Sequence, residues 1–231
     1  MTRSQRLAVF SGVVGALMAG IGIYAVVRER KIVRGVQGLG RQLGRRAAQA
    51  PIVSSYSDGN MRTTLRQSSV MPIEQRVATI QDLIHKSVQD PEMRKIALQV
   101  TSACPERDKM CEAQAIYNFT KSRVRYTGDI GAIVHPDGNV EGVDLFQSAR
   151  RTIEFGGGDC DDHNILNGTL LALNGIDPIL RVVKTRGAPD WEHISAGFLS
   201  GRDFVWVDTT LPGNDQFGVA PSYHKHIDFP A

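Results

Sequence analysis

The chain has few of the residues that mark several specialised classes of protein. Of its 231 residues only 3 are cysteines, 6% are aromatic and 22% are charged, whereas 42% are hydrophobic. This composition excludes a disulfide-rich miniprotein, a collagen-like chain and a wholly disordered chain. No internal repeat is found. The length therefore predicts one or two globular domains with a sizeable core.

The net charge of +3 conceals two different parts of the chain. Residues 1–50 contain nine Lys and Arg residues and one Glu, which gives +8, whereas residues 51–231 carry −5. A single averaged charge therefore says little about binding partners, and the two parts are considered separately.

Residues 7–27 form a run of 21 residues without a charge. A helix of that length spans about 30 Å, the hydrocarbon thickness of a bilayer. A buried core helix is disfavoured because the run is apolar on every face. A cleavable signal peptide needs a nearby small-x-small site, and the only suitable one, at residues 48–50, lies more than twenty residues further on. We therefore predict a retained single-pass membrane anchor after a short tail, residues 1–6.

Small residues recur every four positions in this run, at Gly12, Ala16 and Gly20. Such a stripe lets two membrane helices approach closely, which favours self-association. Glycine is also simply common in membrane helices, so both interpretations remain open.

A basic segment, residues 28–50, follows the predicted anchor, and its charges lie within residues 28–46. Apolar residues alternate with the arginines, as in segments that lie on anionic lipid headgroups. No aromatic residues that could stack on bases are interleaved, so nucleic-acid binding is not predicted. The positive charge after the run favours a cytoplasmic C-terminal domain, although Arg3 and Arg6 oppose that topology.

The remaining sequence predicts a linker and one α+β domain. Residues 51–72 are rich in Ser and Thr and indicate a linker or an extended arm, and residues 73–231 indicate the domain. Helical periodicity precedes strand-like runs, which predicts helices packed against a mostly antiparallel sheet. The predicted elements are helices at 73–89, 91–103 and 105 to about 125, mostly loop at 126–150, a helix between an Asp159 cap and a Gly175 stop, and strands at 179–183, 193–199 and 203–208.

Three glycines and Asp159 precede Cys160, which predicts a capped helix with the cysteine in its first turn. The helix N-terminus favours a thiolate, and the glycines leave the sulfur accessible. Backbone N–H groups at Gly158 and Asp159 are candidates to bind an oxyanion. His193 and Asp208, at the ends of predicted neighbouring strands, supply a base and a group to orient it.

At these residues the sequence resembles the transglutaminase-like superfamily of papain-like cysteine enzymes. The similar segments are AIYNFTKSRVRYTGD, DLFQSARRTIEFGGGDCDDHNILNGTLLALNGIDPILRVV, WEHISAGF and FVWVDTT, which together span about residues 113–210. The resemblance implies that Cys160 is the nucleophile, His193 the base and then the acid, and Asp208 its orienting partner. It implies no cofactor. The DCDD motif is most similar to that of bacterial and phage-encoded members.

Several further residues complete the predicted site. Trp191 is expected to shield the site or line an acyl-binding cleft. Gln147 is a candidate oxyanion donor, because a side-chain amide upstream of the nucleophile often serves so in papain-like enzymes. His163 is open to three interpretations: a rival base, a metal ligand or a packed neighbour. Cys104 and Cys111 are expected to be small core residues.

Two other chemistries are disfavoured. Consecutive residues of a helix point in different directions, and no second Cys/His pair has suitable spacing, so no metal site is predicted. The glycine run is not followed by Lys-Ser/Thr, and three nearby aspartates would repel a phosphate.

The sequence thus predicts a membrane-anchored cysteine hydrolase or acyltransferase that acts on amide bonds of a peptide or protein, with cell-wall peptide as one candidate. Hydrolysis is preferred because nothing marks an amine-acceptor site. The alternative is a non-catalytic, membrane-tethered structural protein of a cell envelope or of a membrane-containing phage virion.

Overall fold

The computed structural model describes residues 52–57, 61–68, 71–129, 132–134, 140–211 and 216–231. The predicted anchor at 7–27 and the basic segment at 28–50 lie outside these residues. No helix within the described ranges is long and apolar enough to cross a membrane.

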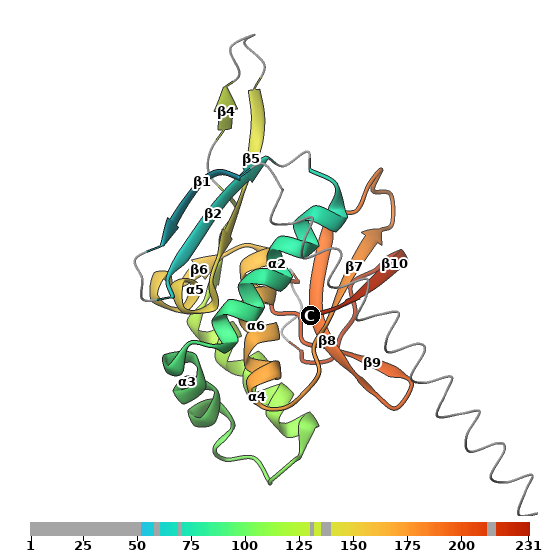
Figure 1. Cartoon of the computed structure of the whole chain (residues 1–231). Helices are drawn as coiled ribbons and strands as arrows, with labels where there is room; N and C mark the ends of the chain where they lie inside the picture. The colour runs from blue at the N-terminus through green and yellow to red at the C-terminus, as the bar shows by residue number, and fades with distance from the viewer. Residues whose placement is uncertain (1–51, 58–60, 69–70, 130–131, 135–139, 212–215) are drawn as a thin grey trace, which may run out of the picture. The chain divides into compact units, whose positions relative to one another are not determined.

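The residues predicted as a linker instead contribute two strands to the folded part of the chain. Strands β1 (Ile52–Ser57) and β2 (Thr63–Ser68) form an antiparallel hairpin, and β2 pairs antiparallel with β5 (Val140–Gln147). With β4 (Ala132–Val134) they make a sheet of order β1-β2-β5-β4 (Figure 1). The predictions of a linker at 51–72 and of mostly loop at 126–150 were therefore wrong. Strands β1 and β2 are rich in Ser and Thr, glycines punctuate the region of β4 and β5, and none of these strands shows an alternating apolar pattern.

Five helices are described. They are α2 (Ile73–Val88), α3 (Pro91–Thr101), α4 (Lys109–Arg123), α5 (Ala149–Phe155) and α6 (Cys160–Leu173). The carboxylates of Asp90 and Asp108 cap α3 and α4, because each accepts a bond from an N–H of the first turn. The third helix therefore begins at Lys109 and not at Pro105.

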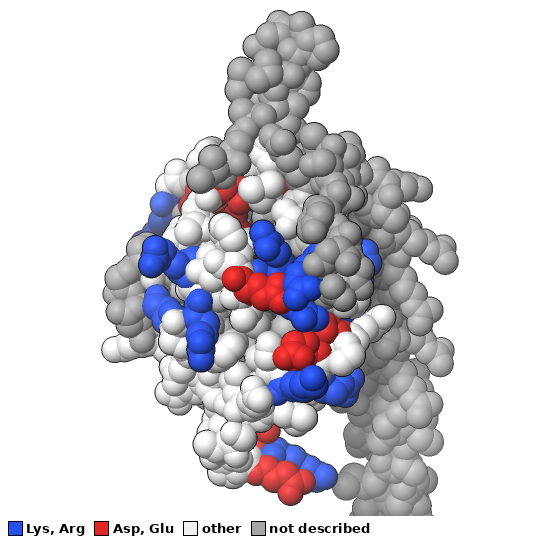
Figure 2. Space-filling model, turned by 90° about the vertical axis from the view of Figure 1, so that its left-hand side faces the viewer, with Lys and Arg blue, Asp and Glu red and all other residues white. Residues whose placement is uncertain are grey.

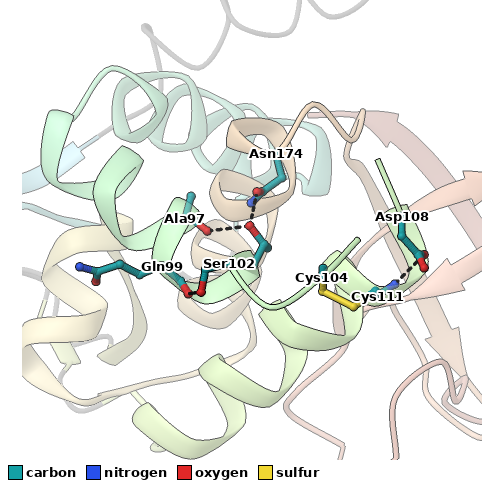
Figure 3. Close-up of a disulfide and its surroundings, with 8 residues drawn as sticks. Ala97, Gln99, Ser102, Cys104, Asp108, Cys111 and Asn174 are labelled. Atoms are coloured by element: carbon teal, nitrogen blue, oxygen red, sulfur yellow. Dashed lines mark hydrogen bonds between the residues drawn. A yellow bond between two sulfur atoms is a disulfide. The ribbon is translucent and has the colours of Figure 1, made fainter. Parts of the chain in front are cut away.

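A disulfide joins Cys104, in the turn after α3, to Cys111, in the first turn of α4 (Figure 3), with the two Cα atoms 5.7 Å apart. The prediction that both cysteines are core residues was therefore wrong. The turn includes Arg107 in the left-handed region, at φ 64°. This reversal folds the chain back on itself and brings the two cysteines together, whereas a helix running on from Pro105 would not.

The second sheet is antiparallel, as predicted, and has the order β10-β7-β8-β9. Its strands are β7 (Ile179–Thr185), β8 (His193–Ser200), β9 (Asp203–Trp206) and β10 (Tyr223–Pro230). The C-terminal strand β10 pairs with β7. There Asp228 makes a two-bond ion pair with Arg181 of β7.

Helix α6 lies between α2 and the second sheet (Figure 1). Its apolar residues belong to one core with residues of α2, β7 and β8, all of which are almost completely buried. These residues are Ile165, Leu166, Leu170, Leu171, Ile80, Leu83, Ile84, Leu180, Val182 and Ala196. The N-terminus of α6 is thereby fixed against strand β8.

Charged side chains of both signs lie near one another on the face shown in Figure 2. Glu154 of α5, for example, pairs with Arg62 and Arg150. Such exposed pairs contribute little to stability. Several of the aspartates that give residues 51–231 their net negative charge lie near Cys160.

Candidate active site

The glycine run shapes the approach to α6. Gly156 ends α5 in the left-handed region, at φ 70°, and β6 (Gly157–Gly158) pairs in parallel with β3 (Arg125–Tyr126). A Cβ atom on Gly158 would lie 2.5 Å from Cβ of Asp162. Only glycine therefore fits where the chain enters the helix.

The predicted cap of α6 is confirmed. The carboxylate of Asp159 accepts bonds from the N–H groups of Asp161, at 2.9 Å, and Asp162, at 3.4 Å. Cys160 is the first residue of the helix, and Gly175, at φ 70°, follows its C-terminal end. The local sequence therefore places Cys160 at the first position of the helix.

We expect Gly158→Ala to lower the free energy of unfolding by about 1–3 kcal/mol, because the added methyl group overlaps Asp162. Gly128→Ala is the matched control, since a Cβ atom there meets nothing within 4 Å. Urea unfolding of the two variants measures the difference. Equal stabilities would show that the entry to α6 tolerates a side chain.

His193 and Asp208 meet as the sequence predicted. His193 is the first residue of β8, Asp208 follows β9, and Nε2 of the imidazole lies 2.6 Å from Oδ2 of the carboxylate. Asp208 also accepts bonds from the Ser195 hydroxyl and, at 2.9 and 2.7 Å, from the N–H and hydroxyl of Thr210. The contact with Asp208 leaves Nδ1 as the ring nitrogen able to exchange a proton with another group.

Asp208 is ionised in this setting. Burial alone would raise its pKa, but the hydrogen bonds from His193, Ser195 and Thr210, with the charge of His193, hold that pKa below its ordinary value. The carboxylate can therefore fix the orientation of the imidazole and stabilise its protonated form.

Cys160 and His193 line one narrow cavity of about 10 Å³, together with Trp191, Arg76 and Asp161. The Cys160 thiol is partly buried and lies 3.7 Å from Oδ1 of Asp161, to which it donates. The cavity therefore brings together Cys160, His193 and Trp191, as predicted.

The electrostatics of the thiol differ from the expectation that a helix terminus would favour the thiolate. Burial, followed by the charges of Asp161 and Asp159, raises the pKa of Cys160 well above its ordinary value of 9.0. The N–H of Ile194 and the charge of Arg76 act in the opposite direction. Cys160 is therefore a thiol at neutral pH and needs a base to become nucleophilic.

Arg76, on α2, is the member of this cavity that sequence reasoning missed. Its Nε lies 2.7 Å from Asp144 Oδ2, and its Nη2 lies 3.5 Å from Asp161 Oδ2. Arg76 thus offsets two carboxylates, one of which contacts the thiol. This pairing has no local signal in the sequence, because α2 and α6 are separated by more than seventy residues.

The DCDD motif contains two further aspartates, Asp159 and Asp162. Burial and the charges of Asp161 and Asp162 raise the pKa of Asp159 to about 9. Burial also raises the pKa of Asp162 to about 8, against the hydrogen bonds from Gln147. Both carboxyls therefore bind a proton more readily than an exposed aspartate does.

Asp161→Asn is expected to accelerate alkylation of Cys160 at pH 7 by about 3- to 10-fold, because it removes the nearest negative charge and so lowers the thiol pKa. Arg76→Met should slow alkylation, since it leaves Asp161 without its counter-ion. The rate of reaction with iodoacetamide, measured as a function of pH, checks both signs. A shift in the same direction for the two variants would contradict this electrostatic arrangement.

Gln147 does not serve as predicted. Its Nε2 donates to Asp162 Oδ2 at 2.7 Å and to the Gly157 carbonyl at 3.1 Å, so the amide hydrogens are committed. It lines a different cavity, of about 330 Å³, together with Gly158 and Asp162. Strand β5, which the sequence did not reveal, places Gln147 there. The assignment of Gln147 as an oxyanion donor was therefore wrong.

His163 is a packed neighbour, one of its three predicted interpretations. It is 1% exposed, and its Nδ1 lies 2.7 Å from the hydroxyl of Thr209. Burial lowers the pKa of His163 to about 4, so the ring is neutral at neutral pH. Among the described residues, no group of three or more His, Cys, Asp or Glu side chains is arranged to hold a metal ion.

A larger cavity, of about 610 Å³, opens beside His193. Tyr126, Leu211 and Pro221 give it apolar walls, and Thr185, Thr209 and Thr210 add hydroxyl groups. His193 also lines the narrow cavity of Cys160, so the larger space adjoins the site on the side of the imidazole.

Comparisons with known proteins found distant structural similarity. No protein-family model matches the sequence, and no curated protein matches it. A candidate cysteine protease from Cytophaga hutchinsonii is 16% identical, with a TM-score of 0.38 over 64% of this chain and 49% of that protein. LapG of Legionella pneumophila is 14% identical, with a TM-score of 0.32 over 74% of this chain and 72% of LapG. This chain thus spans about half the length of the first of these proteins. Similarity at this level carries no argument about activity.

Proposed function

We propose that the chain is a cysteine hydrolase or acyltransferase of the transglutaminase-like class that acts on amide bonds. The observation that carries the proposal is the arrangement of three residues. His193 contacts Asp208 at 2.6 Å and shares a cavity with Cys160, which begins a buried helix. These are the parts that nucleophilic catalysis by a thiol requires: a nucleophile, a base and a group that orients the base.

The reaction follows from the protonation states of the site. His193 takes the proton of the Cys160 thiol, and the sulfur attacks the carbonyl carbon of the substrate to give a tetrahedral oxyanion. When the C–N bond breaks, His193 gives that proton to the departing amine, and a thioester remains on Cys160. Water, or an amine, then attacks the thioester with His193 again as base, which releases the acyl product and restores the thiol.

Other residues of the site support this sequence of steps. Asp208 holds Nε2 of His193, so Nδ1 is the atom that exchanges protons with sulfur and leaving group. The Cys160 N–H, at the first helical position, has no intrahelical acceptor and is the proposed oxyanion donor. The Asp161 and Asp162 N–H groups are taken by the Asp159 side chain. Trp191 would cover the acyl group.

The larger cavity beside His193 suits a peptide chain. Its hydroxyl groups can hydrogen-bond a peptide backbone, and its walls offer both apolar surface and the charged side chains of Lys121 and Glu192 to the residues of a peptide. We therefore propose a peptide or protein substrate that reaches Cys160 past His193.

The Cys104–Cys111 disulfide bears on the compartment, because such bonds persist in oxidising environments. We propose that residues 52–231 face the exterior or the periplasm, tethered by the helix predicted at 7–27, with residues 28–46 on anionic headgroups. This topology is opposite to the one that the charge bias favours, and it makes cell-wall peptide reachable.

Maleimide labelling of the full chain in intact cells tests this topology. We expect Cys104 and Cys111 to react only after reduction, and external protease to digest the domain once the outer barrier is opened. Labelling of both cysteines without reductant, together with protection from protease, would place the domain in the cytoplasm.

The activity itself is tested with a degenerate peptide library and mass spectrometry. We expect the wild-type protein, but not Cys160→Ala, to release peptide fragments. Side-chain deamidation, seen as a gain of about 1 Da, would indicate a glutaminase-type acyltransferase instead. If the wild type and Cys160→Ala leave the library equally unchanged, the non-catalytic tethered role is supported.

A further inference from the structure

Two buried asparagines lie on the nucleophile helix, beside the apolar residues that α6 contributes to the core. Asn164 and Asn167 are both 0% exposed, and they follow Cys160 at positions four and seven on α6. Asparagine is a poor helix former, and a buried amide without partners costs about 1–3 kcal/mol. Their presence needs a reason other than packing.

Asn164 bonds to the strand that carries His193. Its Nδ2 donates to the carbonyl of Cys160 at 2.6 Å and to that of Ile194 at 2.7 Å, and its Oδ1 accepts from the N–H of Ala196 at 2.5 Å. The amide therefore joins the first turn of α6 to β8, one residue beyond His193.

Asn164 takes the place of a neighbouring strand at this edge of β8. The pairing of β9 with β8 stops at Trp206 and Gly197, so the edge of β8 nearer His193 has no strand beside it. There Asn164 satisfies the Ile194 carbonyl and the Ala196 N–H. The N-terminus of α6 is thus inserted where β9 leaves the sheet.

Asn167 makes the corresponding link to the segment that carries Asp208. Its Nδ2 donates to the carbonyl of Val207 at 2.9 Å and lies 3.4 Å from the hydroxyl of Thr209. The residues on either side of Asp208 are therefore held by the same helix, one turn further from Cys160.

We propose that Asn164 and Asn167 are positioning residues that set the register of Cys160 against His193 and Asp208. Cys160 comes from a helix, and His193 and Asp208 come from two separate strand ends. Asn164 bonds to the strand end that carries His193, and Asn167, together with His163, bonds to the residues on either side of Asp208. This inference rests on the proposed function, because the register matters only if Cys160, His193 and Asp208 act together in one reaction.

Two substitutions at Asn164 separate its roles. In Asn164→Ser, the hydroxyl can still bond the Cys160 carbonyl four residues earlier, but it cannot reach β8. Asn164→Ala loses all three bonds. Asn174→Ala is the matched control, because Asn174 also donates to a helix carbonyl at 2.8 Å and accepts from Thr101, but lies at the far end of α6.

The rate of Cys160 alkylation by iodoacetamide is measured as a function of pH, at temperatures where circular dichroism shows each full-length variant to be folded. We expect Asn164→Ser and Asn164→Ala to react about 10- to 100-fold more slowly at pH 7 than wild type. Their pH profile should move toward that of His193→Ala. Asn174→Ala should melt earlier but keep the wild-type profile.

Each outcome has a separate meaning. If Asn164→Ser keeps the wild-type rate and profile while His193→Ala loses them, the positioning role is wrong and the proposed function stands. The positioning role is also wrong if Asn174→Ala changes the profile as much as Asn164→Ser. If His193→Ala itself keeps the wild-type profile, the proposed function fails first. Should Asn164→Ala fail to fold, the milder Asn164→Ser and the corresponding Asn167→Ser decide the question.

Discussion

His193→Ala is expected to slow acylation of Cys160 at pH 7 by about 10²- to 10⁴-fold, the range that a positioned general base contributes. The physical reason is the state of the thiol. Burial and the charges of Asp161 and Asp159 raise the pKa of Cys160, so little thiolate exists without a base. Stopped-flow measurement of acylation by an activated ester gives the rate directly.

The comparison for this variant is His85→Ala, because His85 is an exposed histidine of α2. We expect His85→Ala to react at the wild-type rate. The loss in His193→Ala should shrink at high pH, where hydroxide ionises the thiol without help. Equal rates for His193→Ala and wild type at pH 7 would mean that the imidazole does not act on Cys160.

Asp208→Asn is expected to reduce the acylation rate by about 10²-fold or more. An asparagine offers an N–H in place of one carboxylate oxygen, so it cannot accept from all the groups that now bond to Asp208. These groups are His193, Ser195 and the backbone and hydroxyl of Thr210. Nε2 of His193 can then lose its acceptor, and the proton can move to Nδ1, which blocks that nitrogen as a base.

Asp208→Asn should also change the way in which the free energy of unfolding depends on pH. The pKa of Asp208 is lowered in the folded protein, so the ionised carboxylate contributes stability above its unfolded pKa. That contribution is lost as the pH falls through the folded pKa. Asp208→Asn should therefore be less stable at neutral pH and show a weaker loss of stability on acidification. Asp203→Asn, at the exposed first residue of β9, is the control and should match wild type in both measurements.

The sequence predicted those parts of the site that depend on local patterns. The glycines, the Asp159 cap and the leucine-rich stretch placed Cys160 at the start of α6. Alternating apolar residues revealed β8 and β9, and hence the meeting of His193 and Asp208. A short hairpin brings its two ends together regardless of the rest of the fold, which is why these assignments needed no long-range information.

Other features depend on contacts between distant segments and left no local signal. Strand β2 pairs with β5, which lies more than seventy residues further along the chain, and its Ser- and Thr-rich sequence resembles a linker. Gln147 was placed incorrectly because its strand was not recognised. Asn164 has no local signal for a role in the site, because its partner Ile194 lies thirty residues further along the chain. The Cys104–Cys111 pair depends on a backbone reversal at Arg107, which no propensity indicates.

The most direct test of the proposed chemistry is intact-protein mass spectrometry of the full chain during reaction with an activated ester. The proposal predicts a rapid burst of one acyl group per chain, mapped to Cys160 by peptide digestion and absent from Cys160→Ala. The burst should exceed the rate of a small free thiol under the same conditions and depend on His193. Acylation of Cys160 no faster than that of the free thiol, and unchanged in His193→Ala, would contradict the proposal.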